Sequence, residues 1–252
     1  MIYSIVNLKG GVGKTTTAAA LWAGLGKRGY RTLAIDLDPQ QNLTYNSGAG
    51  ESGKTVLSLL TREASAEEAI QHTDIGDIIA ASKALAGADA FLVETGKEYR
   101  LKEALEPIED NYDYIIIDCP PSLGALSVNA LTVCNKAIAP SQADYFSLQG
   151  IEQLAETVKS VKKYCNHELE IMGILMTRYN DRTVLTKNIT KYVEQISDKL
   201  NTKLFETKIR EGIAIKEAQL SQQSIFDYAP SSNVAADYKK FIEELLVSEK
   251  EQ

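Results

Sequence analysis

The sequence predicts an α/β fold, in which helices cover both faces of a mostly parallel, twisted sheet. Short apolar runs alternate with helical stretches along the chain, as they do where each strand is followed by a crossover helix. The segment Tyr114–Asp118 contains an uninterrupted Ile-Ile-Ile run, which is typical of a strand buried on both faces. The length of 252 residues favours a single domain, residues 1–252, over two small ones.

The expected elements follow from local pattern. The first strand is Ile2–Val6, and the helix Lys14–Arg28 ends at Gly29. Ser65–Glu68 has the capping-box pattern and predicts a helix start. Further strands are expected at Thr32–Asp36, Ile78–Ala80, Lys136–Pro140, Glu170–Thr177 and Lys203–Thr207. Further helices are expected at Lys97–Ile108, Gln149–Tyr164, Thr183–Leu200, Ile213–Leu220 and Val234–Leu246. Right-handed crossovers then place the loops after the strands at one sheet edge, where open α/β sheets bind ligands.

The segment Lys9–Thr16 reads KGGVGKTT and lies between the first strand and the first helix. Glycines let backbone N–H groups turn inward around an anion, and a helix start adds its own free N–H groups. This context predicts a phosphate-binding loop, in which Lys14 reaches the β- and γ-phosphates and the Thr15 hydroxyl holds Mg²⁺. Its expected members are Gly10, Gly11, Val12, Gly13, Lys14, Thr15 and Thr16. The alternative is a flexible turn with two solvated lysines, which the flanking strand and helix disfavour.

Acidic residues follow two of the predicted strands. Asp36 and Asp38 belong to the sequence Asp-Leu-Asp-Pro-Gln, and Asp118 closes the Ile-Ile-Ile run. A carboxylate after a buried apolar strand is the Walker B arrangement, which holds Mg²⁺. We therefore expect a magnesium site at Thr15, Asp36 and Asp118. The alternative is that these aspartates cap turns or helices, as Asp-Pro often does.

The phosphate loop departs from the standard G-x-x-x-x-G-K-[ST] pattern, because Leu8 stands at the first glycine and Lys9 starts the loop. It resembles the deviant Walker A loop K-G-G-x-G-K-T-T. The segments at Asp36 and Asp118 are similar to D-x-D-P-Q and D-x-P-P-x-x-G in ParA and MinD proteins. The resemblance covers nearly the whole chain, including the pair Glu217-Ala218. The chain is identified as a single P-loop NTPase domain of the ParA/Soj type, related to MinD.

The resemblance implies an ATPase that uses ATP and Mg²⁺. In this branch the extra lysine, here Lys9, reaches the partner's phosphates across a nucleotide-sandwich homodimer. Asp38 would orient the attacking water, while Asp36 would support Mg²⁺ through water. The expected catalytic residues are Lys9, Lys14 and Asp38.

The adenine pocket is also expected from the resemblance. MinD carries a segment similar to Thr177–Asn180 there, so Thr177 and Arg178 would contact the base. Arg210 would form the second wall. The alternative for Arg178 is an ordinary surface arginine in a loop.

Other members of the branch fit less well. MinD ends in a basic amphipathic membrane helix, whereas Phe241–Gln252 is acidic and would be repelled by anionic lipid. Iron-protein and arsenical-pump relatives use characteristic cysteines, but Cys119, Cys134 and Cys165 lie far apart and are expected to be buried small hydrophobes. A strand at residue 2 leaves no room for an N-terminal helix-turn-helix. We therefore expect the short ParA type, which binds double-stranded DNA non-specifically as an ATP dimer.

Charge alone does not indicate a nucleic-acid protein, because 27 Lys+Arg stand against 34 Asp+Glu, a net charge of −7. Lysines gathered on one face can nevertheless form an attractive patch. The expected DNA-contacting residues are Arg182, Lys187, Lys191, Lys203, Lys208 and Lys216. Soj proteins often carry an arginine where Ala214 stands, and a solvated surface is the alternative for each cation.

The resemblance also implies a ParB-like centromere-binding partner that stimulates hydrolysis. The chain shows neither a signal peptide nor an apolar run of about 20 residues, so we expect a cytoplasmic, nucleoid-associated protein without a membrane partner. Two other functions stay open. One is a MinD-like positioning ATPase that acts on a membrane or a protein scaffold. The other is a biosynthetic P-loop ligase similar to cobyrinate amidases or dethiobiotin synthetases.

Overall fold

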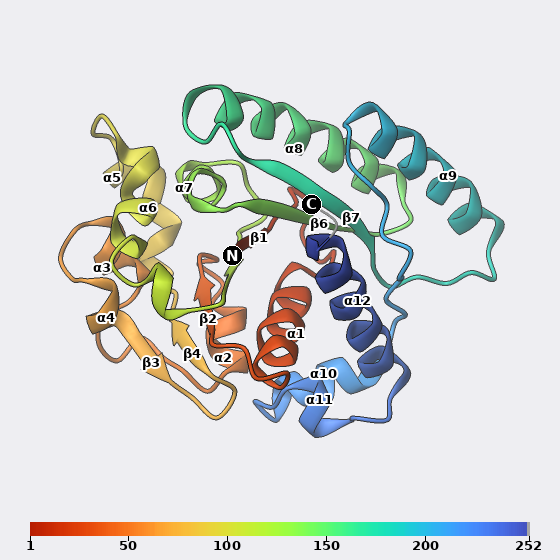
Figure 1. Ribbon diagram of the computed structural model, residues 1–252, viewed down its shortest axis with the longest axis horizontal. Coiled ribbons are helices and arrows are strands. Elements are labelled where there is room, and N and C mark those ends of the chain that lie inside the picture. Colours follow the sequence, from red (N-terminus) through yellow and green to blue (C-terminus); the bar gives the residue numbers. More distant parts are fainter. Residues whose placement is uncertain (251–252) are drawn as a thin grey trace.

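A seven-stranded sheet forms the centre of the computed structural model, which describes residues 1–250 (Figure 1). The strand order is β3-β4-β2-β5-β1-β6-β7. The strands are β1 (Ile2–Ile5), β2 (Thr32–Asp36), β3 (Ile70–His72), β4 (Asp77–Ile79), β5 (Tyr114–Asp118), β6 (Lys136–Ser141) and β7 (Glu170–Met176). Neighbouring strands are parallel, apart from the antiparallel pair β3–β4 at one edge. The expected fold class is confirmed.

Helices cover both faces of this sheet (Figure 1). The longer ones are α1 (Lys14–Gly26), α7 (Ala125–Val133), α8 (Tyr145–Tyr164), α9 (Val184–Lys199), α10 (Ile213–Leu220) and α12 (Asn233–Lys250). The shorter ones are α2 (Asn42–Asn46), α3 (Val56–Leu60), α4 (Ala66–Ala69), α5 (Ala88–Phe91), α6 (Arg100–Leu105) and α11 (Ile225–Tyr228). Single 3₁₀ turns occupy Lys83–Gly87, Lys97–Tyr99 and Glu109–Asn111. In the described part of the chain, no helix is both long and apolar enough to cross a membrane.

Two hydrophobic cores form because successive side chains of a strand point to opposite faces of the sheet. Ile2 and Val6 pack with α3 and α5–α9 on one face. Tyr3 and Ile5 pack with α1, α2 and α10–α12 on the other. The alternation therefore explains why one strand supports two layers of helices.

The expected strand Lys203–Thr207 is wrong. Leu204 forms only an isolated bridge to β7. The backbone N–H groups of Glu206 and Thr207 donate to the Glu244 carboxylate of α12, at 2.7 and 2.9 Å. Phe205 still donates its N–H to Ile174 of β7 (3.0 Å), but the next donor on that side, Thr207, is directed at a side chain, so the ladder ends there.

The expected helix Lys97–Ile108 is also shorter than predicted. It consists of a 3₁₀ turn followed by α6, which ends at Leu105, and Pro107 has no backbone N–H with which to continue. The capping box at Ser65–Glu68 is confirmed. Cys165 is half-buried, so the expectation of a buried residue is wrong there.

The strand register positions the acidic residues. Asp36 of β2 lies directly opposite Asp118 of β5, and Asp118 in turn pairs with Ile5 of β1. The loop Lys9–Thr16 follows β1 at the same edge. Three separate segments therefore bring their polar residues to one point of the sheet.

Helices α1 and α12 approach closely at Gly24. A methyl group there would collide with Ile242 and lie 2.9 Å from Phe226. Alanine favours a helix by about 1 kcal/mol over glycine, but overpacking costs about 1–3 kcal/mol. We predict that Gly24→Ala lowers the melting temperature by a few degrees, measured by calorimetry.

The matched control is Gly87→Ala, whose new methyl group would meet only Phe91, at 3.8 Å. This variant should melt at or above the wild-type temperature. If Gly24→Ala melted at the same temperature as the control, the contact between α1 and α12 would accept the methyl group with no loss of stability.

Candidate active site

The loop Lys9–Thr16 connects β1 to α1 and leaves the start of α1 open. Gly11 and Gly13 have φ angles of 75° and 91°, a left-handed conformation that glycine adopts without steric cost. Gly13 is the N-cap of α1, and it has no side chain to accept the first N–H groups of the helix. These N–H groups are therefore free to bind an anion.

Two side chains that follow strand ends hold this loop in place. The buried Asn7 donates its Nδ2 to a carbonyl of β6 (2.7 Å) and accepts the backbone N–H of Lys9 (3.0 Å). Thr177, just after β7, donates its hydroxyl to the carbonyl of Val12 (2.7 Å). The loop geometry is thus fixed by hydrogen bonds before any ligand enters, which reduces the ordering cost of binding.

The two lysines of the loop lie in different environments. Lys14 is buried and donates its Nζ to the carbonyl of Lys9 (3.1 Å). Burial lowers the pKa of Lys14, while nearby Asp118 raises it. Lys9 forms an ion pair with Asp144 and lies 3.4 Å from the Ser147 hydroxyl. Lys14 therefore lies inside the site, whereas Lys9 is held at its rim by the first turn of helix α8.

Asp144 is the N-cap of α8, because its Oδ1 accepts the backbone N–H of Ser147 (3.0 Å). Burial raises the pKa of Asp144, but the hydrogen bonds from Lys9 and Ser147 outweigh this effect and lower it. The carboxylate is thus charged at neutral pH and suited to holding Lys9.

Asp118 carries the clearest sign of a missing ligand. Both oxygens of its carboxylate are buried, and neither accepts a hydrogen bond from residues 1–250. Burial and then the charge of Asp36 raise the pKa of Asp118 well above its usual range, while the adjacent Thr15 hydroxyl lowers it. A buried carboxylate without partners costs free energy, and a hard divalent cation would remove that cost.

Asp36 has a different set of partners. Its Oδ2 accepts the N–H and the hydroxyl of Thr44, both at 2.8 Å, and its Oδ1 accepts the N–H of Asp38 (3.0 Å). Burial raises the pKa of Asp36 to about 6, although these hydrogen bonds oppose the rise. Asp36 therefore fixes the turn that carries Asp38, whose Oδ1 accepts the N–H of Gln40 (2.9 Å).

These residues fit a magnesium ion bound together with phosphates. No group of three or more His, Cys, Asp and Glu side chains in residues 1–250 is arranged to hold a metal by itself. Thr15 and Asp118 supply the hard oxygen atoms that Mg²⁺ prefers, and Mg²⁺ usually takes its remaining ligands from phosphates and water. The donor set therefore suits a nucleotide-bound Mg²⁺ and not a resident metal.

The residues expected at the adenine pocket are brought together. Thr177, Arg178 and Arg210 line a hollow of about 130 Å³ beside Gly13 and Thr16 of the phosphate loop. The Arg210 guanidinium is held by bonds of 2.7 and 2.9 Å to a carboxylate of α12. The hollow therefore adjoins the phosphate loop, and its role as an adenine pocket stays a prediction.

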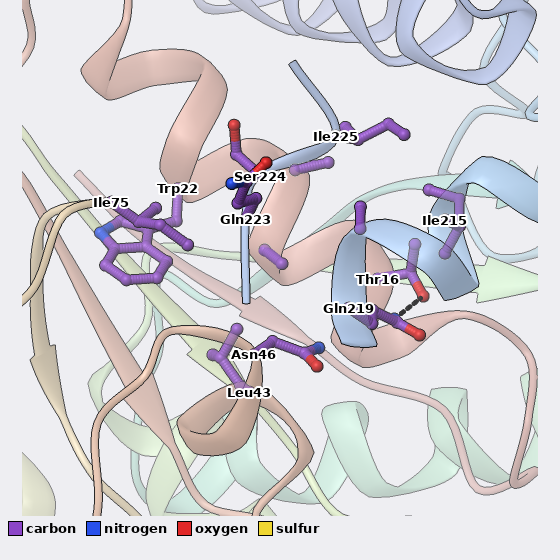
Figure 2. Close-up of a pocket in the computed structure, with 13 residues that line it drawn as sticks. Thr16, Trp22, Leu43, Asn46, Ile75, Ile215, Gln219, Gln223, Ser224 and Ile225 are labelled. Atoms are coloured by element: carbon purple, nitrogen blue, oxygen red, sulfur yellow. Dashed lines mark hydrogen bonds between the residues drawn. The ribbon is translucent and has the colours of Figure 1, made fainter. Parts of the chain in front are cut away.

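A second cavity lies behind the phosphate loop (Figure 2). On one side of it Gln219 of α10 donates to the Thr16 hydroxyl (3.4 Å), and Trp22 and Ile75 line the opposite side. Its volume of about 30 Å³ suits one or two water molecules. This cavity is therefore a packing gap, and the Gln219–Thr16 hydrogen bond beside it links α10 to the phosphate loop.

The DNA-contacting candidates do not form one cluster. Arg182 and Lys208 line an open hollow together with the two adenine-side arginines, and Lys216 lines the adenine hollow itself. Lys203 lies apart, in a groove at the amino end of β7, where it contacts Ser248. Two others are exposed on α9: Lys187 and Lys191. The structure thus separates Lys203 from the rest.

Sequence reasoning missed several residues that position the site: Asn7, Thr44, Asp144 and Ser147. The spacing Asp-x-x-Ser before the amphipathic pattern of α8 is a recognisable N-cap signal for Asp144. Asn7 and Thr44 act only through residues distant in sequence or across a turn, so no local pattern announces them.

The chain is similar to several known proteins. A family model described as an AAA domain matches residues 1–171. The sporulation initiation inhibitor protein Soj of Bacillus subtilis is 40% identical over 249 residues, which cover 97% of each chain. The chromosome partitioning protein ParA of Caulobacter vibrioides is 34% identical over 258 residues, covering 100% of this chain and 96% of that protein. A solved structure of cobyrinic acid a,c-diamide synthase from Mycobacterium smegmatis, with an ATP analogue and magnesium bound, has a TM-score of 0.86 at 33% identity. That match covers 97% of this chain and 93% of the other.

Asp118→Asn should remove the effect of Mg²⁺ on nucleotide binding, because it neutralises a buried carboxylate whose two oxygens have no hydrogen-bond partner in residues 1–250. We predict that Mg²⁺ raises the melting temperature of the wild-type protein with ADP, but not that of Asp118→Asn. Ligand at about 100 times its dissociation constant stabilises by about 2.7 kcal/mol, a shift that thermal denaturation resolves.

The matched control is Asp74→Asn, which changes an exposed aspartate and should keep the magnesium response. An Asp118→Asn protein that still responds fully to Mg²⁺ would place the metal elsewhere.

Proposed function

Because this chain belongs to the Soj/ParA family of P-loop ATPases, we propose that it is a partition ATPase that segregates plasmid or chromosomal DNA. The observation that supports this most directly is the second lysine of the phosphate loop. Lys9 lies at the surface of the site, held by a single carboxylate, Asp144. A lysine so placed can exchange one anionic partner for another, and this exchange is the basis of the proposed cycle.

ATP binding comes first in this cycle. The N–H groups of the loop and Lys14 hold the phosphates, while Thr15 and Asp118 hold Mg²⁺. Mg²⁺ held by Thr15 and Asp118 would supply positive charge next to the phosphates. Asp38, fixed by its hydrogen bond to Asp36, orients the attacking water.

Dimerisation follows when Lys9 leaves Asp144 for the phosphates of a second copy. The γ-phosphate then becomes part of a homodimer interface, so that hydrolysis weakens the interface. The basic side chains around Arg182 and Lys208 of each copy contribute to a joint surface for non-specific double-stranded DNA. Two linked sites gain avidity without new contacts. A ParB-like partner stimulates hydrolysis, and the protein acts in the cytoplasm on the nucleoid.

A ligase is the second candidate, because the chain is similar to the cobyrinic acid a,c-diamide synthase of Mycobacterium smegmatis. A MinD-like positioning ATPase on a membrane or scaffold is the third. DNA retention separates the partition function from both.

Asp144→Asn should strengthen ATP-dependent dimerisation. Asparagine still caps α8, but it no longer holds Lys9 by charge. A partly exposed ion pair contributes about 0.2–1 kcal/mol, and each dimer breaks two of them, so we predict a dimer dissociation constant lower by up to about thirtyfold. Analytical ultracentrifugation with a non-hydrolysable ATP analogue measures it.

Lys9→Ala is the companion variant and should not dimerise under the same conditions. Weaker dimerisation of Asp144→Asn would mean that Asp144 positions Lys9 for its partner instead of competing for it.

DNA binding should require ATP and fall steeply with salt, because phosphate contacts release counterions. The slowly hydrolysing Asp38→Ala variant should retain random-sequence duplex with ATP and not with ADP. Adding Arg182→Glu and Lys208→Glu should abolish retention, whereas Lys203→Glu, in a separate groove, should not. Filter binding at several salt concentrations measures these differences.

Failure to retain duplex even at low salt would contradict the partition function. Sedimentation with anionic vesicles would then identify the positioning alternative, and turnover of a carboxylic acid substrate would identify the ligase.

A further inference from the structure

A hollow of about 140 Å³ lies between the end of α3, the segment after α5 and the start of α6. These three helices lie close together in Figure 1. The hollow combines apolar and cationic side chains. Its lining residues are Leu60, Thr61, Phe91, Leu92, Val93, Glu94, Lys97 and Arg100.

Arg100 is only 8% exposed, and its guanidinium is incompletely paired. Nη2 donates to the Glu94 carboxylate, whereas the buried Nε has no partner in the part of the chain that the structure describes. The Nε–Nη2 edge of a guanidinium presents two parallel donors that match the two oxygens of a carboxylate. One of these two donors is used here and the other is left unpaired.

Glu94 is a removable occupant of this edge. Its side chain is 70% exposed, while that of Arg100 is 9% exposed. Moving Glu94 into water therefore costs little, because most of its side chain is solvated already. The ion pair also demonstrates that a carboxylate reaches Arg100 from the outside.

The surroundings indicate what else a ligand must carry. Phe91 and Val93 beside the hollow are 38% and 68% exposed, and Lys97 adds a second cation. A volume of about 140 Å³ is well below the roughly 300–1,000 Å³ of cofactor and metabolite pockets. The hollow has room for one side chain, next to apolar surface that a neighbouring residue could cover.

We propose that this hollow binds an acidic side chain, flanked by apolar residues, on a protein partner. The partner's carboxylate occupies the Nε–Nη2 edge of Arg100 and displaces Glu94. Its apolar neighbours cover Phe91 and Val93.

The walls of the hollow are tied to the helix that follows the Walker B segment. Asp89 of α5 accepts the N–H of Ala125, the first residue of α7 (2.7 Å). Asn129 of α7 donates to the carbonyl of Lys97 (2.9 Å) and accepts the N–H of Leu101 (3.0 Å). A partner bound here thus contacts elements that hold the loop after Asp118, which is the part of the inference that rests on the proposed function.

The test uses a blocked peptide with one glutamate between leucines, and its glutamine counterpart. The probe resonance is the Arg100 Nε–H in an ¹H–¹⁵N spectrum, identified by its loss in Arg100→Lys. The glutamate peptide should shift this resonance and the glutamine peptide should not. Glu94→Gln should lower the dissociation constant by about fivefold, since it removes an exposed competitor. Glu103→Gln, which breaks the neighbouring exposed pair with Arg62, should leave it unchanged.

Equal shifts with both peptides, or no response to Glu94→Gln, would overturn the proposal. Acetate binding as tightly as the peptide would overturn the protein partner, because the apolar flank would then add nothing. An Arg100 variant could fail to fold, so Val93→Ser provides a second test. It should weaken peptide binding without changing the melting temperature.

ATP turnover with saturating glutamate peptide tests the link to the active site. A changed turnover supports it. Unchanged turnover with intact peptide binding overturns the link alone, and loss of DNA retention would overturn the partition function without affecting peptide binding.

Discussion

The electrostatics of the site depend on two carboxylates that face each other across neighbouring strands. Both lie at the carboxyl ends of these strands. The register sets Asp36 opposite Asp118, and burial raises the pKa of both. Lys14 is the buried cation nearby, and burial lowers its pKa as well. Without ligand, these raised pKa values favour protonated carboxyl groups, and a bound divalent cation would stabilise their ionised form. Asp36 is satisfied by Thr44 and Asp38, which leaves Asp118 as the open position.

The two lysines of the phosphate loop lie at different depths relative to these buried carboxylates, and this difference separates their roles. Lys14 lies in the interior, where it is buried and bonded to the carbonyl of Lys9. Lys9 lies at the rim and is held by Asp144, a helix cap with partners of its own. If Lys9 exchanges the Asp144 carboxylate for a phosphate, Asp144 still caps α8 and the backbone of that helix is undisturbed. A nucleotide-dependent contact can therefore form without refolding any element.

Much of this arrangement is predictable from the sequence, for definable reasons. The strand tips and the phosphate loop carry strong local signals, since apolar runs, glycines and acidic ends occur in order. Lys203–Thr207 has the composition of a strand, but Glu244, distant in sequence, takes its backbone donors. Asn7 is set by tertiary contacts in the same way. The burial of Arg100 is equally invisible, because a charged residue at a helix start is ordinarily exposed. Local pattern thus predicts the elements and motifs. The residues that hold the site in place depend on contacts between elements, which local pattern does not show.

The surface charge also bears on how such a protein could hold DNA. The net charge is −7, and the open hollow that contains Arg182 and Lys208 also contains Asp181 and Glu211. A single copy therefore presents a mixed surface, which attracts a polyanion weakly and only over about one Debye length. Joining two such surfaces rigidly multiplies their weak affinities through effective concentration, whereas separating them returns each to a level that physiological salt suppresses. A monomer whose surface binds DNA only weakly is thus an advantage in the proposed cycle, because DNA binding then depends on the nucleotide-bound dimer and ends when the γ-phosphate is lost.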